Sequence, residues 1–178
     1  MLSQLCPLTD YLFISGMKAL QPDRLRCAGI THIINCTMEV PCVQMPDMQC
    51  TQIKVSDTPG ARLGVHFDRA ADIIRQVQQK GGRVLVHCVA GVSRSATLCI
   101  VYLMKYSRMS LRDSYLFVKS KRPIIRPNPG FFKQMIDYEQ RLNGRTSVTM
   151  ISLPVGIIPD VYREQYDNMV FVNPTRRF

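Results

Sequence analysis

The chain has 178 residues and a formal net charge of +10, because 23 Lys and Arg outnumber 13 Asp and Glu. A chain of this length is expected to form one domain, and its longest apolar run near the middle, Leu98–Met104, is too short to cross a membrane. The positive charge favours an acidic partner, which leaves nucleic acid, an anionic membrane surface and a phosphorylated substrate open.

The first third of the chain alternates short predicted strands with one short helix. Alternating and β-branched residues predict three strands, at Tyr11–Ser15, Thr31–Cys36 and Gln52–Ser56. A short helix is expected from Pro22 to Ala28, since proline begins it and a glycine follows it. Residues 37–50 are rich in Met, Pro and Cys and are expected to form an irregular loop.

The middle of the chain carries a stronger helical signal. Apolar residues at helical spacing predict an amphipathic helix over residues 63–80: Leu63, Phe67, Ala70, Ile74 and Val77. A short strand, Val84–Val86, is followed by a loop and then by an apolar helix that ends near Ser107. A capping box at Ser110–Asp113 is expected to open the next helix, which runs to Lys121.

A last helix is predicted to begin at Asn128, with Phe132, Met135, Ile136 and Leu142 as its core positions. Strands that alternate with helices predict a single α/β domain, with a mostly parallel or mixed central sheet of about five strands flanked by about six helices. The pattern weakens after Arg145. We therefore divide the chain into a domain over residues 1–145 and an extension over 146–178 that packs on the domain or trails from it.

The segment that predicts chemistry joins the Val84–Val86 strand to the following helix through a Cys-x5-Arg loop. Such a loop points backbone N–H groups and the positive end of the helix dipole at one place, which makes an anion-binding cradle. Gly91 allows the tight turn, and Arg94 can grip two oxygens of a phosphate. The same surroundings favour the thiolate form of Cys88, which would then be a nucleophile for phosphorus.

The full run His87-Cys-Val-Ala-Gly-Val-Ser-Arg-Ser-Ala-Thr97, followed by Tyr102-Leu-Met104, resembles the dual-specificity phosphatases of the cysteine-based protein tyrosine phosphatase superfamily. The resemblance extends from the first strand to the helix after Asn128, and Pro154–Tyr162 is similar to the tail of a small subgroup. No rhodanese-like docking domain precedes the motif, so the chain resembles the small, atypical members. The resemblance implies that residues 1–145 are the catalytic domain.

The resemblance assigns the main roles in such a site. Cys88 would be the nucleophile, and the loop residues would bind the phosphate: Val89, Ala90, Gly91, Val92, Ser93 and Arg94. The leaving oxygen needs a proton, and the family supplies it from an aspartate about thirty residues before the cysteine. Asp57 lies 31 residues before Cys88, just after a predicted strand. Three other aspartates fit less well, because they fall in an irregular loop or within a helix: Asp47, Asp68 and Asp72.

The resemblance also implies three secondary roles. Ser95 matches a hydroxyl that stabilises the departing thiolate, although a serine is also ordinary at a helix N-terminus. His87 matches a residue that orients the loop. Asn128 matches a residue that hydrogen-bonds the loop, and the same side chain is a good helix N-cap. No cofactor and no metal is implied.

The substrate class follows from what the loop lacks. Val89, Ala90 and Val92 are neutral, whereas related lipid phosphatases often place lysine there, so phosphoinositides are disfavoured. A shallow pocket would admit phosphotyrosine together with phosphoserine and phosphothreonine. Phosphorylated proteins are therefore the expected partners, and mitogen-activated protein kinases are frequent targets in the family. No specific nucleic acid is expected, and the preference among the three phosphoresidues stays open.

Two alternatives belong to other functional classes. The same fold can act as an RNA 5′-phosphatase, which the basic charge would also suit. The domain could instead be a phosphate-binding scaffold without turnover, but scaffolds typically lose the cysteine, the arginine or the acid, and all three are present here. The chain is expected in the cytoplasm, with the nucleus accessible. Association with mitochondria and the oligomeric state stay open.

The seven cysteines are expected to be reduced thiols, because no export signal is evident. A metal site built from His32, Cys36, Cys42 and Cys50 is disfavoured, because the spacing lacks a Cys-x2-Cys pair. Cys88 must be free if it attacks phosphorus. A regulatory disulfide between Cys88 and a second cysteine is chemically possible, but the sequence does not say which cysteine is near enough.

The basic residues are unevenly spread. Residues 94–133 hold nine Lys and Arg and a single acid, Asp113, which accounts for eight of the ten net positive charges. The cluster begins at Arg94, so we expect it to form a positive field that steers phosphorylated substrates to the loop.

Overall fold

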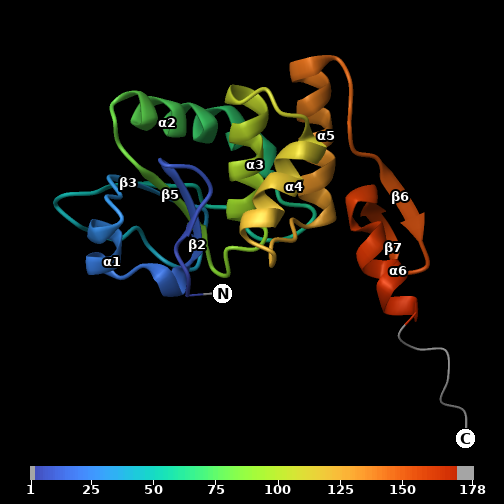
Figure 1. Cartoon of the computed structure of the whole chain (residues 1–178), viewed down its shortest axis with the longest axis horizontal. Helices are drawn as coiled ribbons and strands as arrows, with labels where there is room; N and C mark the ends of the chain where they lie inside the picture. Colours follow the sequence, from blue (N-terminus) through green and yellow to red (C-terminus); the bar gives the residue numbers. More distant parts are fainter. Residues whose placement is uncertain (1–2, 172–178) are drawn as a thin grey trace, which may run out of the picture.

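A computed structural model describes residues 3–171 of the chain as an α/β domain built on one five-stranded sheet (Figure 1). The strand order is β1-β2-β5-β3-β4, and every pairing is parallel except β1 with β2. The strands are β1 (Cys6–Pro7), β2 (Leu12–Gly16), β5 (Val84–Cys88), β3 (His32–Asn35) and β4 (Gln49–Gln52). β5 is thus the central strand.

Helices cover both faces of this sheet, and α1 and α2 lie on opposite sides of the strands in Figure 1. The helices are α1 (Pro22–Cys27), α2 (Phe67–Gln79), α3 (Arg94–Tyr106), α4 (Leu111–Lys121), α5 (Pro129–Asn143) and α6 (Arg163–Phe171). Successive side chains of a strand point to opposite faces. Accordingly Val84 and Val86 of β5 join the larger core under α2–α5, whereas Leu85 joins the smaller core with Leu25 of α1.

The predicted fold class is confirmed: the chain is a single α/β domain, and residues 3–171 form a five-stranded mixed sheet flanked by six α-helices. The predicted N-cap residues Ser110 and Asn128 each accept a hydrogen bond from the third residue of their helix. Two local predictions were wrong. Residues 53–56 lie outside the named strands, because β4 ends at Gln52, although the backbone N–H of Ile53 still donates to the carbonyl of Asn35 at 2.8 Å. Leu142 is exposed, because it lies in the last turn of α5.

The extension after Arg145 contains structure that the weak pattern did not predict. A hairpin of β6 (Met150–Leu153) and β7 (Gly156–Pro159) leads through a 3-10 turn into α6, beside α5 (Figure 1). Tyr162 anchors it, since its ring is fully buried against Tyr115 and Phe132 and its hydroxyl donates to the carbonyl of Pro127 at 2.7 Å. Residues 172–178 of the predicted extension lie outside the described residues.

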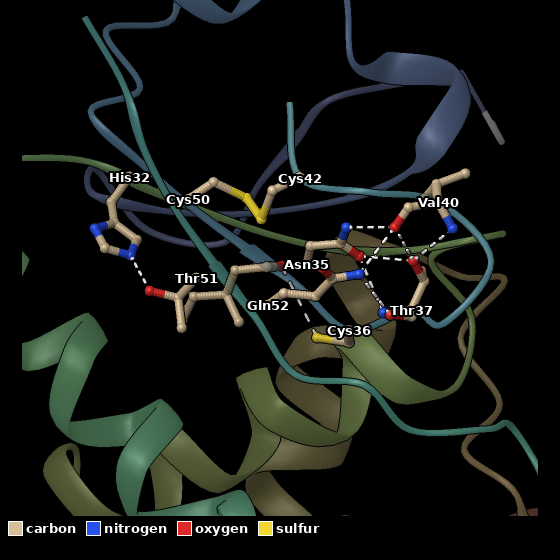
Figure 2. Close-up of a disulfide and its surroundings, with 10 residues drawn as sticks. His32, Asn35, Cys36, Thr37, Val40, Cys42, Cys50, Thr51 and Gln52 are labelled. Carbon is tan, nitrogen blue, oxygen red and sulfur yellow. Dashed lines mark hydrogen bonds between the residues drawn. A yellow bond between two sulfur atoms is a disulfide. The ribbon is translucent and has the colours of Figure 1, made fainter. Parts of the chain in front are cut away.

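The expectation that all cysteines are reduced was wrong for one pair. Cys42 and Cys50 form a disulfide whose Cα atoms are 5.9 Å apart (Figure 2). The pattern missed it because β4 begins at Gln49, three residues earlier than predicted, which places Cys50 in the sheet where the loop folds back over it. Cys88 is free, as predicted, and so are the other four cysteines.

Among residues 3–171, none of the helices combines the length and the apolar character that a membrane crossing requires.

Candidate active site

The candidate site lies at the carboxyl end of β5, where a loop over residues 89–93 leads into α3. Gly91 is in the left-handed region at φ +70°, and a Cβ there would lie 2.5 Å from the backbone of Ser15. Only glycine both adopts this backbone angle without strain and leaves room for the backbone of Ser15. From the outer side, Arg122 donates to the carbonyls of Gly91 at 2.8 Å and Ala90 at 3.1 Å. The loop is therefore held in one shape by β2 and by Arg122.

Cys88 lies at the base of this loop and is almost fully buried. The backbone N–H of Gly91 donates to its Sγ at 3.2 Å, and the hydroxyl of Ser95 lies 3.2 Å from the same sulfur. Both residues belong to the loop or to the first turn of α3, whose dipole has its positive end here. These neighbours stabilise negative charge on the sulfur.

Arg94 is buried, and only part of its guanidinium is occupied. Glu39 binds its end in a two-pronged contact, with Nη1 donating to Oε2 at 2.8 Å and Nη2 donating to Oε1 at 3.0 Å. Nη1 also donates to the carbonyl of Val55 at 2.9 Å. The Nε–H is buried without a hydrogen-bond partner within the described part of the chain. A buried donor without a partner is costly, and here it lies beside the loop that the sequence assigns to phosphate.

The contact with Arg94 also sets the ionisation of Glu39. The hydrogen bond from the guanidinium lowers the pKa of this carboxyl to about 2. Glu39 is thus ionised at any pH near neutrality. Sequence reasoning missed it, because the residue lies in an irregular loop 55 positions before Arg94 and no spacing connects the two.

Asp57 is the one predicted acid candidate that the structure brings to the site. Its Oδ1 accepts from Ser93 Oγ at 2.7 Å and from Asn128 Nδ2 at 2.9 Å, while its Oδ2 lies 3.9 Å from Arg94 Nε. The other candidates lie elsewhere: Asp47 pairs with Arg26, and Asp68 and Asp72 pair with Lys105.

Asn128 and His87 both occupy supporting positions. Asn128 caps α5 through Oδ1, which accepts from the N–H of Phe131, so its amide serves the helix and Asp57 together. His87 is fully buried, with Nδ1 3.3 Å from the carbonyl oxygen of Cys88. Burial lowers the pKa of His87 to about 4, so the ring is neutral near pH 7. This fits a structural role for His87 in the loop.

The basic cluster over residues 94–133 is less free than its sequence suggested. Arg94, Lys105 and Arg112 are each paired with a carboxylate from outside that stretch. Arg122 donates hydrogen bonds to two carbonyl oxygens of the loop. The positive field of the cluster is therefore reduced at Arg94, Lys105 and Arg112, whereas hydrogen bonds to carbonyl oxygens leave the charge of Arg122 in place.

Comparison with known proteins places this chain in a family. The model of the family described as "Dual specificity phosphatase, catalytic domain" matches residues 12–141. The chain is 48% identical to human dual specificity protein phosphatase 18 over 169 residues, which cover 94% of this chain and 90% of that protein. It is 50% identical to mouse dual specificity protein phosphatase 14 over 141 residues, covering 79% and 71% of the two chains.

Solved structures agree with this placement. The crystal structure of human DUSP28 (Y102H) superimposes with a TM-score of 0.76 at 33% identity, over 79% of this chain and 97% of that chain. A mouse putative dual specificity phosphatase complexed with zinc tungstate gives a TM-score of 0.76 at 33% identity, over 79% and 89%. The chain therefore belongs to the dual specificity phosphatase family and is a small dual-specificity protein phosphatase.

Proposed function

We propose that this chain hydrolyses phosphotyrosine, phosphoserine and phosphothreonine in proteins through a cysteinyl-phosphate intermediate, with Cys88 as nucleophile. The observation that carries the proposal is the buried Nε–H of Arg94, which has no hydrogen-bond partner among residues 3–171 and lies 3.9 Å from Asp57 Oδ2. Glu39 and Val55 occupy the end of the guanidinium, which leaves Nε and the second Nη2 hydrogen as a two-pronged donor. A phosphate bound there would satisfy the buried donor and lie over the Cys88 sulfur.

In the first step the Cys88 thiolate attacks phosphorus, and the bond from phosphorus to the ester oxygen breaks. Asp57 gives a proton to the leaving oxygen as general acid. Its position supports this assignment, because Ser93 and Asn128 donate to Oδ1 and hold the carboxyl beside the loop, with Oδ2 3.9 Å from Arg94 Nε. The loop N–H groups and Arg94 hold the charge that develops on the phosphoryl oxygens.

In the second step Asp57, now a carboxylate, takes a proton from a water molecule that attacks the phosphocysteine. The bond from phosphorus to sulfur breaks and inorganic phosphate forms. Ser95 donates to the departing thiolate, a role that its 3.2 Å distance from Sγ supports. His87 and Asn128 hold the loop and the acid in place.

Phosphorylated proteins are the proposed substrates, with mitogen-activated protein kinases among the candidates, in the cytoplasm and the nucleus. The neutral side chains of Val89, Ala90 and Val92 support a phosphoprotein over a phosphoinositide. We also propose that residues 1–145 form the catalytic domain and that the described part of the extension, residues 146–171, braces it, as the burial of Tyr162 supports.

Hydrolysis of an aryl phosphate by the wild type and by Cys88→Ser tests the mechanism. We expect turnover by the wild type and none above background by the variant. Comparable rates for the two proteins would refute thiolate attack, and no activity in the wild type would favour a silent phosphate-binding scaffold. A panel of peptides with phosphotyrosine, phosphothreonine or phosphoserine then defines the preference. Release of phosphate from a 5′-triphosphorylated RNA, but from none of the peptides, would favour an RNA phosphatase.

A further inference from the structure

The loop between β3 and β4, residues 36–48, carries Glu39, the residue that contacts Arg94. Three side-chain groups converge on one backbone oxygen of this loop, the carbonyl of Val40 (Figure 2). Asn35 Nδ2 donates at 2.9 Å, Gln52 Nε2 at 3.0 Å and Thr37 Oγ1 at 3.1 Å. Asn35 and Gln52 belong to β3 and β4, so the first part of the loop is tied to two strands of the sheet.

The disulfide is a second attachment of the same loop. Cys50 lies in β4, where it pairs with Ile33 of β3, and the bond ties Cys42 to it (Figure 2). Cys42 follows Val40 by only two residues, and Glu39 precedes Val40 directly. Glu39 is therefore held between an anchor at Thr37 and an anchor at Cys42, although its own side chain is half exposed.

Glu39 contacts the site through the guanidinium of Arg94. Its carboxylate binds the Nη1 and Nη2 end of the guanidinium and also accepts from the N–H of Met38 at 2.8 Å. Because Glu39 fixes the Nη1 and Nη2 end of the planar guanidinium, the opposite edge, which carries the Nε–H, keeps a single orientation. A pre-oriented fork loses less freedom when an oxyanion binds than a mobile one does.

We propose that Glu39 is a positioning residue for Arg94 and that the Cys42–Cys50 disulfide regulates it, so that reduction of the bond weakens phosphate binding. The proposal rests on the proposed function of Arg94. Both cysteines are half-buried, so a small reductant can reach them. The step consumes one dithiol: the bond between the two sulfurs breaks, each sulfur gains one electron and one proton, and the dithiol closes to its own disulfide.

The binding test removes the catalytic thiol, because a dithiol would also act on an oxidised Cys88. In a Cys88→Ser background, tungstate binding is titrated before and after treatment with dithiothreitol. Alkylation and mass spectrometry count the thiols in each sample. We expect the disulfide in the untreated protein and roughly threefold to tenfold weaker tungstate binding after reduction. Equal affinity in the two samples, or two free thiols at Cys42 and Cys50 before treatment, would overturn the proposal.

The kinetic test is a double-mutant cycle with Cys88 intact. Glu39→Gln keeps the size of the side chain but puts an amide donor against the guanidinium, and we expect roughly a tenfold rise in KM with a smaller fall in kcat. Cys42→Ser/Cys50→Ser should raise KM in the same way. If the disulfide acts through Glu39, the triple variant should be no worse than Glu39→Gln alone. Additive effects would show that the disulfide does not act through Glu39.

Cys27→Ser is the matched control, since Cys27 is an exposed free thiol on α1, and it should leave KM unchanged. Thermal unfolding of each variant separates a local effect from a folding defect. If the double serine variant does not fold, the tungstate titration of the reduced Cys88→Ser protein still decides the question. Failure of this proposal would leave wild-type turnover and its loss in Cys88→Ser intact, so the two proposals are tested separately.

Discussion

Ser93 Oγ donates to Asp57 Oδ1 at 2.7 Å, which links the loop over residues 89–93 directly to the proposed acid. Asn128 donates to the same oxygen from the start of α5, and its own backbone N–H donates to Ser93 Oγ at 3.1 Å. The three residues thus form a closed hydrogen-bonded triangle. The orientation of Asp57 consequently depends on the loop that is proposed to bind the phosphate.

This triangle predicts that removing either donor weakens proton donation. Ser93→Ala and Asn128→Ala should each lower kcat by roughly tenfold for an alkyl phosphate, since a misplaced acid loses part of its contribution. Aryl phosphates with acidic leaving groups need less protonation and should be affected less. Steady-state kinetics on both substrate types measure the difference. An equal loss on both would mean that the triangle maintains the loop rather than the acid.

Asp57→Asn tests the acid itself. The amide keeps the size of the side chain but donates no proton, so turnover of alkyl phosphates should fall by about 10²-fold to 10⁴-fold. In a plot of log kcat against the pKa of the leaving group, the slope for Asp57→Asn should be steeper than for the wild type. Asp47→Asn is the matched control, because Asp47 pairs with Arg26 outside the site and should leave kcat unchanged. An unchanged slope in Asp57→Asn would place the acid elsewhere.

Two glycines with similar φ angles allow the effect of backbone strain to be measured apart from the effect of steric crowding. Gly91 and Gly81 have φ of +70° and +73°, but only at Gly91 would a Cβ meet other atoms, the backbone of Ser15 at 2.5 Å. Gly81→Ala should cost about 1 kcal/mol of stability and leave turnover intact. Gly91→Ala should abolish turnover, because the loop must move away from β2. Urea unfolding and kcat measured on both variants check this, and normal turnover in Gly91→Ala would contradict it.

His87 predicts a pH dependence of stability. Its pKa falls from 6.5 in the unfolded chain to about 4 in the folded one, because burial disfavours the charged ring. The unfolded state then binds more protons between these values, so stability decreases as pH falls from 6.5 towards 4, by up to about 3 kcal/mol. His87→Gln should flatten this part of the curve. Urea unfolding at several pH values measures it, and an unchanged slope would mean that other groups cause it.

Much of the fold was predictable, because the elements near the site carry strong local signals. The helix over Phe67–Gln79 shows regular apolar spacing, and Ser110 and Asn128 are good N-cap residues. The hairpin over Met150–Pro159 was not predictable, since its strands are short and half exposed and gain their order from packing beside α5.

The candidate site divides in the same way. Cys88, Gly91 and Arg94 lie within seven residues of the chain, so the full motif between a predicted strand and a predicted helix indicated their roles. Glu39 and Arg122 reach the same loop from distant segments. A single sequence contains no sign of such contacts, because they arise only when β3, β5 and the segment after α4 come together.

The most direct measurement of the central claim is the trapping of the phosphoenzyme. A phosphotyrosine peptide is mixed with the chain for a few milliseconds and quenched in acid, and the digested protein is analysed by mass spectrometry. The account predicts one added phosphoryl group on the peptide that contains Cys88, and none in Cys88→Ser. Turnover without any such adduct, or an adduct on another residue, would contradict the account.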